Sequence, residues 1–361
     1  MRICFLADAG SINTRTWVDY FSDRLGHDVH VVSVCRGGEL SPSVSLHQLG
    51  AHRDGMRGAA KLAYLAQVPR IRRLVHSLAP DIVVGYRVAS YGYLAATVGL
   101  HPFVVVAQGQ HIVAPDSPRA NFFFARRAIA AADLCHAWAP HSGRRLVELG
   151  AAENDVFVCP KGIDLTGFVP AENGSAGPAL IATRALHRHY GIDNIVRGVA
   201  IASKDVPDLR ATIAGDGEAR EELEALARDL GAGDRIRFAG AVANADLPAR
   251  LREHTLYASA VPTDGVSASL LEAMACGLFP IVADNAANRN WITEGETGRL
   301  LESPTPEMYA AAIVDAWRDE DLRARSRAAN RATVETRADL DANMRTIERR
   351  YARLIAEAGG D

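Results

Sequence analysis

Short runs of aliphatic and β-branched residues alternate with longer helical segments along almost the whole chain of 361 residues. This alternation is the strongest constraint on its fold. Early examples are RICFLA, DVHVVSV, DIVVG and FVVVAQG, which begin at residues 2, 28, 81 and 103. Strands that are apolar on both faces and separated by helices form a parallel sheet with helices covering both sides. We therefore predict an α/β chain with doubly wound parallel sheets.

The alternation restarts after residues 171–179 (AENGSAGPA), whose small and polar residues are typical of a linker. We predict two Rossmann-like domains, 1–170 and 171–335, followed by a C-terminal helix over 336–361. Ligands of such sheets bind outside the carboxyl ends of the strands, so we expect the site in a cleft between the domains. The last helix carries an apolar stripe that must cover a surface of either domain: Leu340, Met344, Ile347, Tyr351 and Leu354.

Composition excludes several classes of protein. Hydrophobic residues make up 48% of the chain and charged residues 23%, which is too apolar for a disordered protein. The net charge of −3 argues against a general nucleic-acid binder. The five cysteines include no C-x-x-C pair, which favours buried reduced thiols over disulfides or zinc. The first apolar run is too short for a signal peptide, and we expect a cytoplasmic protein.

The densest motif is PTDGVSASLLEAMACGLFPIVAD, residues 262–284. We predict a strand ending near Val261, a turn at Asp264-Gly265, and a helix that starts near Ser267 and ends at Gly277. The free N–H groups at the helix start belong to Val266, Ser267 and Ala268, and they suit a pyrophosphate. Asp264 and Glu272 could accept hydrogen bonds from sugar hydroxyls. The ordinary alternative is an Asp-Gly turn, a serine N-cap and a solvent-facing glutamate.

This block resembles the donor-site signature of the retaining glycosyltransferases of family 4, which have the GT-B fold. The family signature is E-x7-E, and here Glu272 is the second acid while Asp264 replaces the first. The resemblance implies that Glu272 holds the ribose hydroxyls of the nucleotide. It implies that Asp264, Gly265 and the amides after them hold the donor sugar and the distal phosphate. It also implies that the C-terminal helix crosses back onto the first domain.

The segment AGDG places Gly215 and Gly217 where the family has its glycine-bearing strand end, near the nucleotide. The family also has an Arg and a Lys that neutralise the diphosphate. This chain keeps Arg184, but Tyr190 stands at the Lys position, and Arg188 or His189 could substitute. A fixed cation would stabilise the negative charge that builds on the leaving diphosphate. The alternative for Arg188 and His189 is a solvated turn.

Two parts of the first domain complete the predicted site. His111, after the strand FVVVAQG, could bind the donor sugar or guide the acceptor, or could be a solvent-facing or cleft-wall residue. Gly10 could let the backbone approach the phosphate. The segment PRANFFFARR, 118–127, could contact a lipid-linked acceptor at the inner face of a membrane, or form a buried helix with basic ends.

The resemblance implies a retaining glycosyltransferase, of the hexosyltransferase class, that moves a sugar from a nucleotide diphosphate to a hydroxyl. We expect a UDP-sugar first and a GDP-sugar next, with an acceptor in surface polysaccharide, glycolipid or natural-product biosynthesis. The donor is a co-substrate, and no metal or other cofactor is implied. The leaving phosphate can take the acceptor proton, so no protein nucleophile is required. The alternatives are a sugar-nucleotide epimerase, a pseudo-glycosyl transferase, or a non-catalytic nucleotide-sugar binder.

Overall fold

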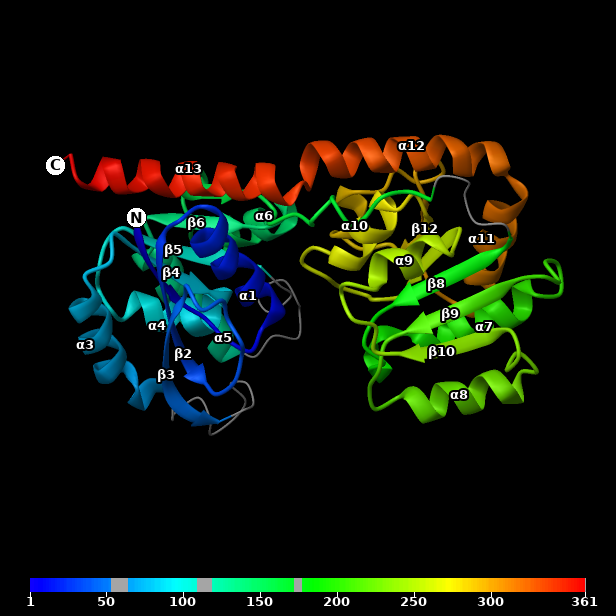
Figure 1. The fold of residues 1–361 in the computed structure, drawn as a ribbon, viewed down its shortest axis with the longest axis horizontal. Coiled ribbons are helices and arrows are strands. Elements are labelled where there is room, and N and C mark those ends of the chain that lie inside the picture. The colour runs from blue at the N-terminus through cyan, green and yellow to red at the C-terminus, as the bar shows by residue number, and fades with distance from the viewer. Residues whose placement is uncertain (53–63, 109–118, 172–176, 361) are drawn as a thin grey trace. The chain divides into compact units, whose positions relative to one another are not determined.

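The computed structural model describes residues 1–52, 64–108, 119–171 and 177–360, and it divides the chain into two units (Figure 1). The first unit contains Met1–Lys161 and Asn343–Asp361, and the second contains Gly162–Ala342. The chain therefore passes between units at 161–162 and 342–343, whereas the sequence suggested 170–171 and 335–336. The difference arises because Ile163 and Phe168, before the Gly-rich segment, are buried in the core of the second unit.

The sheet of the first unit has seven parallel strands in the order β3-β2-β1-β4-β5-β6-β7. Its strands are β1 (Arg2–Leu6), β2 (Asp28–Cys35), β3 (Ser45–His52), β4 (Ile82–Tyr86), β5 (Phe103–Ala107), β6 (Leu134–Ala137) and β7 (Val156–Val158). The helices between them are α1 (Ile12–Asp19), α3 (Val68–Leu78), α4 (Tyr93–Ala96), α5 (Arg119–Ala131) and α6 (Pro140–Glu148). Every residue of β4 and β5 is buried, as expected of strands that are apolar on both faces.

The sheet of the second unit has six parallel strands in the order β10-β9-β8-β11-β12-β13. Its strands are β8 (Ala179–Thr183), β9 (Arg210–Ala214), β10 (Ile236–Gly240), β11 (Leu256–Ser259), β12 (Phe279–Ala283) and β13 (Arg299–Leu301). Its helices are α7 (Ile192–Ala202), α8 (Arg220–Asp229), α9 (Leu247–Arg252), α10 (Ala268–Ala275), α11 (Pro306–Arg318) and α12 (Glu320–Arg337). The strand order reverses between β8 and β11, and ligands of open α/β sheets bind outside the carboxyl ends of the strands at such a reversal. The predicted doubly wound architecture is confirmed.

The C-terminal helix α13 (Leu340–Ala358) buries Met344, Ile347, Tyr351 and Leu354, four members of the predicted apolar stripe. From Asn343 onward it belongs to the first unit. The Tyr351 ring stacks on Phe21 with centroids 6.1 Å apart. The Tyr351 hydroxyl lies 3.0 Å from Nδ1 of the fully buried His136, whose Nε2 lies 2.8 Å from the Cys159 carbonyl oxygen. These partners suit a neutral imidazole that donates from Nε2 and accepts at Nδ1.

We predict that His136 makes the first unit less stable in acid. Burial lowers the pKa of His136 to about 4, from 6.5 for an unperturbed histidine. Between these values the unfolded state binds more protons than the folded state, so the free energy of unfolding falls as pH decreases. We expect a loss of roughly 3 kcal/mol across that window. Urea unfolding at several pH values between 7 and 4 measures it.

His136→Gln should flatten this pH dependence, since glutamine does not titrate. His101→Gln is the matched control, because the His101 side chain is 58% exposed and pairs with Asp133 at 2.7 Å. If wild type and His136→Gln lose the same stability in acid, another group is responsible.

Helix α5 contains the phenylalanine-rich segment, which the sequence left as either a membrane-contacting surface or a buried helix with basic ends. Phe122 and Phe124 are half-buried, whereas Phe123 is 59% exposed and Arg126 and Arg127 face solvent. The segment is therefore part core and part surface. Within the described ranges, no helix is both long enough and apolar enough to cross a bilayer. All five cysteines are buried free thiols, as the sequence predicted.

Candidate functional site

Two loops of the second unit meet where its strand order reverses. Strand β8 leads directly into Arg184, and β11 leads into the loop that holds Asp264. Nη1 of Arg184 donates a hydrogen bond to Oδ2 of Asp264 over 3.1 Å, and the two side chains are 23% and 15% exposed. The structure thus joins two predicted site residues that lie 80 positions apart in the sequence.

The Arg184 guanidinium also lies over the ring of Tyr190, with Cζ 4.7 Å from the ring centroid. Burial by itself lowers the pKa of Arg184, but the charge of Asp264 and the neighbouring Tyr257 and Tyr190 outweigh it, so the pKa is raised. Arg184 is therefore a permanent, partly desolvated cation at the end of β8. A cation in this environment attracts an anion more strongly than one in open water.

Helix α10 begins where the sequence predicted. Ser267 is the N-cap, and its hydroxyl oxygen accepts a hydrogen bond from the Leu270 amide over 3.4 Å. The amides of Val266, Ser267 and Ala268 have no hydrogen-bond acceptor within the described ranges of the chain. They are the groups that an anion would accept from.

The amide of Gly265 is occupied, because it donates to Oδ1 of Asp264 over 2.8 Å. Gly265 therefore shapes the Asp264 turn, and its amide is committed to that turn in the structure. In this loop, the amides left to bind the phosphate of a sugar donor are therefore those of the three residues that follow Gly265.

Sequence inspection did not single out Tyr257, whose hydroxyl contacts a serine at the start of α10. The Tyr257 side chain is buried, and its hydroxyl lies 2.9 Å from Oγ of Ser269, which lies 3.3 Å from Oγ of Ser267. Burial raises the pKa of Tyr257, and the nearby charge of Glu272 raises it further. Glu272 is half-buried on the second turn of α10.

The two glycines of AGDG have a packing role that the sequence did not reveal. A Cβ atom on Gly215 would lie 1.9 Å from the carbonyl oxygen of Arg184, and one on Gly217 would lie 2.5 Å from that of Leu186. The Leu186 amide donates to the Asp216 carbonyl oxygen over 2.9 Å. These glycines let the loop after β9 lie directly against the backbone that carries Arg184.

In the structure, Arg188 contacts Glu222 and His189 contacts Tyr190. Nε of Arg188 bonds to Oε2 of Glu222 on α8 over 3.0 Å, and both side chains are more than 60% exposed (69% and 64%). The ring of His189 packs against Tyr190, with centroids 4.3 Å apart.

The remaining predicted residues belong to the first unit. Gly10 follows β1, and its amide donates to Oδ1 of Asp8 over 3.0 Å. Lys161 donates to Oδ1 of Asn13 over 3.4 Å, beside the start of α1. His111 lies outside the described residues. Arg87, at the end of β4, has a φ of 64°, which is uncommon for a residue with a side chain and which the sequence does not signal.

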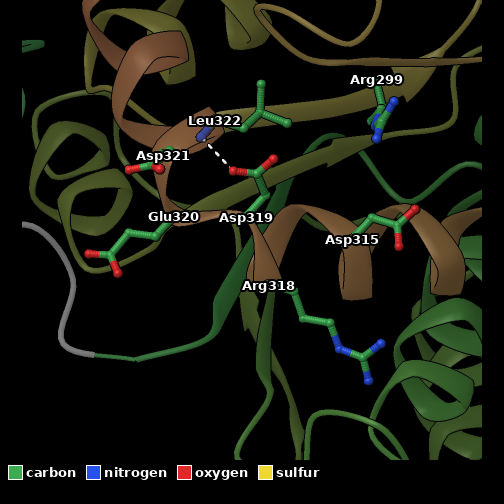
Figure 2. A pocket seen from close by; sticks show the side chains of 7 residues that line it. All are labelled: Arg299, Asp315, Arg318, Asp319, Glu320, Asp321 and Leu322. Atoms are coloured by element: carbon green, nitrogen blue, oxygen red, sulfur yellow. Dashed lines mark hydrogen bonds between the residues drawn. The ribbon is translucent and has the colours of Figure 1, made fainter.

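The structure also contains a hollow of about 630 Å³ elsewhere in the second unit, and none of the predicted residues line it. Figure 2 shows its lining residues: Arg299, Asp315, Arg318, Asp319, Glu320, Asp321 and Leu322. Asp319 caps α12 by accepting a hydrogen bond from the Leu322 amide over 2.8 Å. Within the described part of the chain, no three His, Cys, Asp or Glu side chains gather as metal ligands.

Two family models match the chain, one in each half. Residues 172–333 match the model of glycosyl transferases group 1, and residues 2–135 match a model described as glycosyl transferase 4-like. The first match contains Arg184 and the whole segment around α10.

Individual proteins are similar to parts of the chain. A UDP-N-acetylglucosamine–peptide N-acetylglucosaminyltransferase GtfA subunit of Streptococcus parasanguinis is 33% identical over 137 residues, covering 37% of this chain and 26% of the relative. A phosphatidyl-myo-inositol mannosyltransferase of Mycobacterium tuberculosis is 29% identical over 219 residues, covering 57% and 54%. The chain thus spans about half the length of these relatives or less.

A solved structure of HepE from Anabaena, in complex with UDP and glucose, has the same fold with a TM-score of 0.80. It is 18% identical and covers 98% of this chain and 99% of its own. At this identity the likeness establishes the architecture of both units.

Proposed function

Because the chain belongs to the group 1 glycosyl transferase family and has the GT-B fold, we propose that it is a retaining glycosyltransferase with a nucleotide-sugar donor. The observation that carries the proposal is the Arg184–Asp264 pair beside the open amides at the start of α10. A guanidinium and a helix N-terminus are both suited to a diphosphate. Carboxylates such as Asp264 and Glu272 are suited to sugar hydroxyls.

The chemistry follows from where negative charge develops. As the bond between sugar and phosphate breaks, charge builds on the diphosphate, and Arg184 with the amides of α10 stabilises it. The acceptor hydroxyl attacks the sugar and passes its proton to a phosphate oxygen. The sugar thereby changes from phosphate to acceptor without a protein carboxylate acting as nucleophile, in contrast to retaining glycosidases.

The donor is proposed to be a UDP-sugar first and a GDP-sugar next. UDP-N-acetylglucosamine stands in the name of one relative, and UDP with glucose is bound to HepE. A hydroxyl of a polysaccharide, glycolipid or natural product is the proposed acceptor. A lipid-linked acceptor would suit the exposed Phe123, Arg126 and Arg127 of α5, since an apolar and basic surface binds an anionic membrane.

A thermal-shift screen tests the donor. Melting temperatures are measured with UDP, GDP, ADP and dTDP and with their sugar conjugates. A nucleotide present at about 100 times its dissociation constant adds about 2.7 kcal/mol to stability, so we expect a rise of roughly 5 °C with the correct one. Uridine and guanosine are the matched controls, because they lack the diphosphate. If no nucleotide raises the melting temperature, the proposed donor site is wrong.

Product analysis separates the rival functions. An epimerase converts a nucleotide sugar without any acceptor, so incubation with donor alone identifies it. A pseudo-glycosyl transferase couples a non-sugar ring in place of a sugar. A non-catalytic binder would show a thermal shift but neither transfer nor slow donor hydrolysis. A glycosyltransferase should show both sugar transfer and slow donor hydrolysis.

A further inference from the structure

Arg184 is held from two directions by groups of different kinds. The carboxylate of Asp264 holds one edge through the 3.1 Å hydrogen bond, and the Tyr190 ring lies 4.7 Å from Cζ. A carboxylate binds the guanidinium but also opposes its positive charge. An aromatic ring binds the guanidinium through its quadrupole and adds no net charge. The ring therefore restrains Arg184 without reducing its attraction for a phosphate.

The Tyr190 ring is itself fixed in place. Tyr190 ends the short 3-10 turn Arg188–Tyr190, and its amide donates to the His187 carbonyl oxygen over 2.9 Å. The rings of His187 and His189 lie 5.4 Å and 4.3 Å from the Tyr190 ring. Tyr190 also packs against the hydrophobic core of the second unit. Its ring is thus a fixed surface.

Gly191 ends this turn and directs the chain into α7. Its φ is 67°, a backbone conformation that favours glycine, and a Cβ atom there would lie 3.0 Å from Cβ of Ala260. Ala260 immediately follows β11, the strand that leads to Asp264. The Tyr190 turn is therefore packed against the start of the Asp264 loop, so both partners of Arg184 are positioned by adjoining segments.

Restraint of this kind matters for catalysis by charge. A free arginine side chain loses rotamer entropy when it is fixed against a ligand. A guanidinium already held in one orientation needs little reorganisation as charge develops on a leaving group. The bond to Asp264 uses only part of the five N–H donors of a guanidinium, so donors remain for a phosphate.

We propose that Tyr190 is a positioning residue, which orients the Arg184 guanidinium toward the diphosphate of the donor through its ring. The inference rests on the proposed function and adds to it a residue outside the segment 262–284, which holds Asp264 and Glu272. It assigns the restraint to the aromatic ring of Tyr190.

A double-mutant cycle tests it. Tyr190→Leu, Tyr190→Phe, Arg184→Ala and Tyr190→Leu with Arg184→Ala are assayed for sugar transfer or donor hydrolysis. Affinity for UDP and GDP is measured by calorimetry on the same proteins. We expect Tyr190→Leu to lower kcat about tenfold with a smaller change in KM, and Tyr190→Phe to stay within about threefold of wild type. In the Arg184→Ala background, Tyr190→Leu should have no further effect.

Trp317→Leu is the matched control. It removes another aromatic ring of the second unit that lies over a guanidinium, since Arg323 Cζ is 4.8 Å from the Trp317 centroid. We expect it to leave kcat at the wild-type value, and melting temperatures show whether each variant folds. The Phe variant keeps the inference testable if the Leu variant does not fold. A hydrogen bond from the Tyr190 side chain also raises the pKa of Arg184, so a tenfold loss in Tyr190→Phe assigns the restraint to the hydroxyl and overturns its assignment to the ring.

The outcomes distinguish this inference from the proposed function. If Tyr190→Leu lowers kcat equally in the wild-type and Arg184→Ala backgrounds, or does not lower it at all, the role of Tyr190 is overturned. The proposed function is not affected by either result. A wild-type protein that binds no nucleoside diphosphate and transfers no sugar overturns the proposed function, and this inference with it. If nucleotide binds without turnover, the cycle is measured in dissociation constants. Tyr190→Leu should then weaken binding in the wild-type background and have no further effect in the Arg184→Ala background, and any other result overturns the inference.

Discussion

Arg184→Ala is expected to lower kcat by about ten- to a hundredfold, the largest effect of any single substitution considered. The variant removes the cation that pairs with Asp264, while that partly buried carboxylate keeps its hydrogen bond from the Gly265 amide. A hydrogen bond to a charged group contributes about 1.5–3 kcal/mol, which corresponds to this range. The loss should fall mainly on kcat, because the charge on the diphosphate is greatest as the bond breaks. Steady-state kinetics with the donor identified by thermal shift measures it.

Two further variants sharpen this prediction. Arg184→Lys keeps the charge but loses the planar fork, so an intermediate rate is expected if geometry contributes. Arg318→Ala is the matched control, because Arg318 is 62% exposed and faces Asp205 at 3.6 Å in the same unit. Wild-type turnover in Arg184→Ala would contradict the proposed site. A loss of similar size in Arg318→Ala would indicate damage to the unit as a whole.

The fold was largely predictable from the chain because its signals are local. Strands such as β4 and β5 are apolar at every position, and parallel strands buried on both faces require that composition. The N-cap at Ser267 was predictable for the same reason, since a serine before an apolar helical run is a local signal. The passage between the two units at residues 161–162 has no such local signal, because burial of Ile163 and Phe168 depends on the tertiary fold.

The sequence identified candidate site residues, but it did not identify which residues contact one another. Arg184 and Asp264 were candidates, but only the structure shows their hydrogen bond. Arg188 was one of two candidates for a substitute cation, with a solvated turn as the alternative, and the structure shows it paired with Glu222, 34 residues away. Tyr190 was noticed only as a departure from a family pattern. Contacts between distant residues leave no periodic trace in one sequence, so these pairings required coordinates.

The roles of Gly215 and Gly217 illustrate the same limit. The family resemblance implied that they lie near a nucleotide. The structure shows a close approach to the backbone of Arg184 and Leu186. Both interpretations use the absence of a side chain, and one sequence does not say which neighbour requires it.

Glu272→Ala is expected to act differently from Arg184→Ala. If Glu272 holds the ribose hydroxyls, as the family resemblance implies, these hydrogen bonds persist throughout the reaction and are equally strong in the ground and transition states. Its loss should raise the KM for the donor by at least about tenfold and change kcat much less. The dissociation constant for the matching nucleoside diphosphate should rise by a similar factor. Calorimetry and steady-state kinetics on one preparation measure both.

The control for this variant is Glu307→Ala, an exposed acid in the first turn of α11. It removes the same charge from the same unit and should leave KM unchanged. Glu272→Gln separates charge from hydrogen bonding, since an amide still accepts one bond from a hydroxyl, and we expect an intermediate KM. Equal affinity for ribo- and deoxyribonucleotides in both wild type and Glu272→Ala would contradict a contact with the ribose. Glu272 would then act only through its charge near Tyr257, whose pKa it raises.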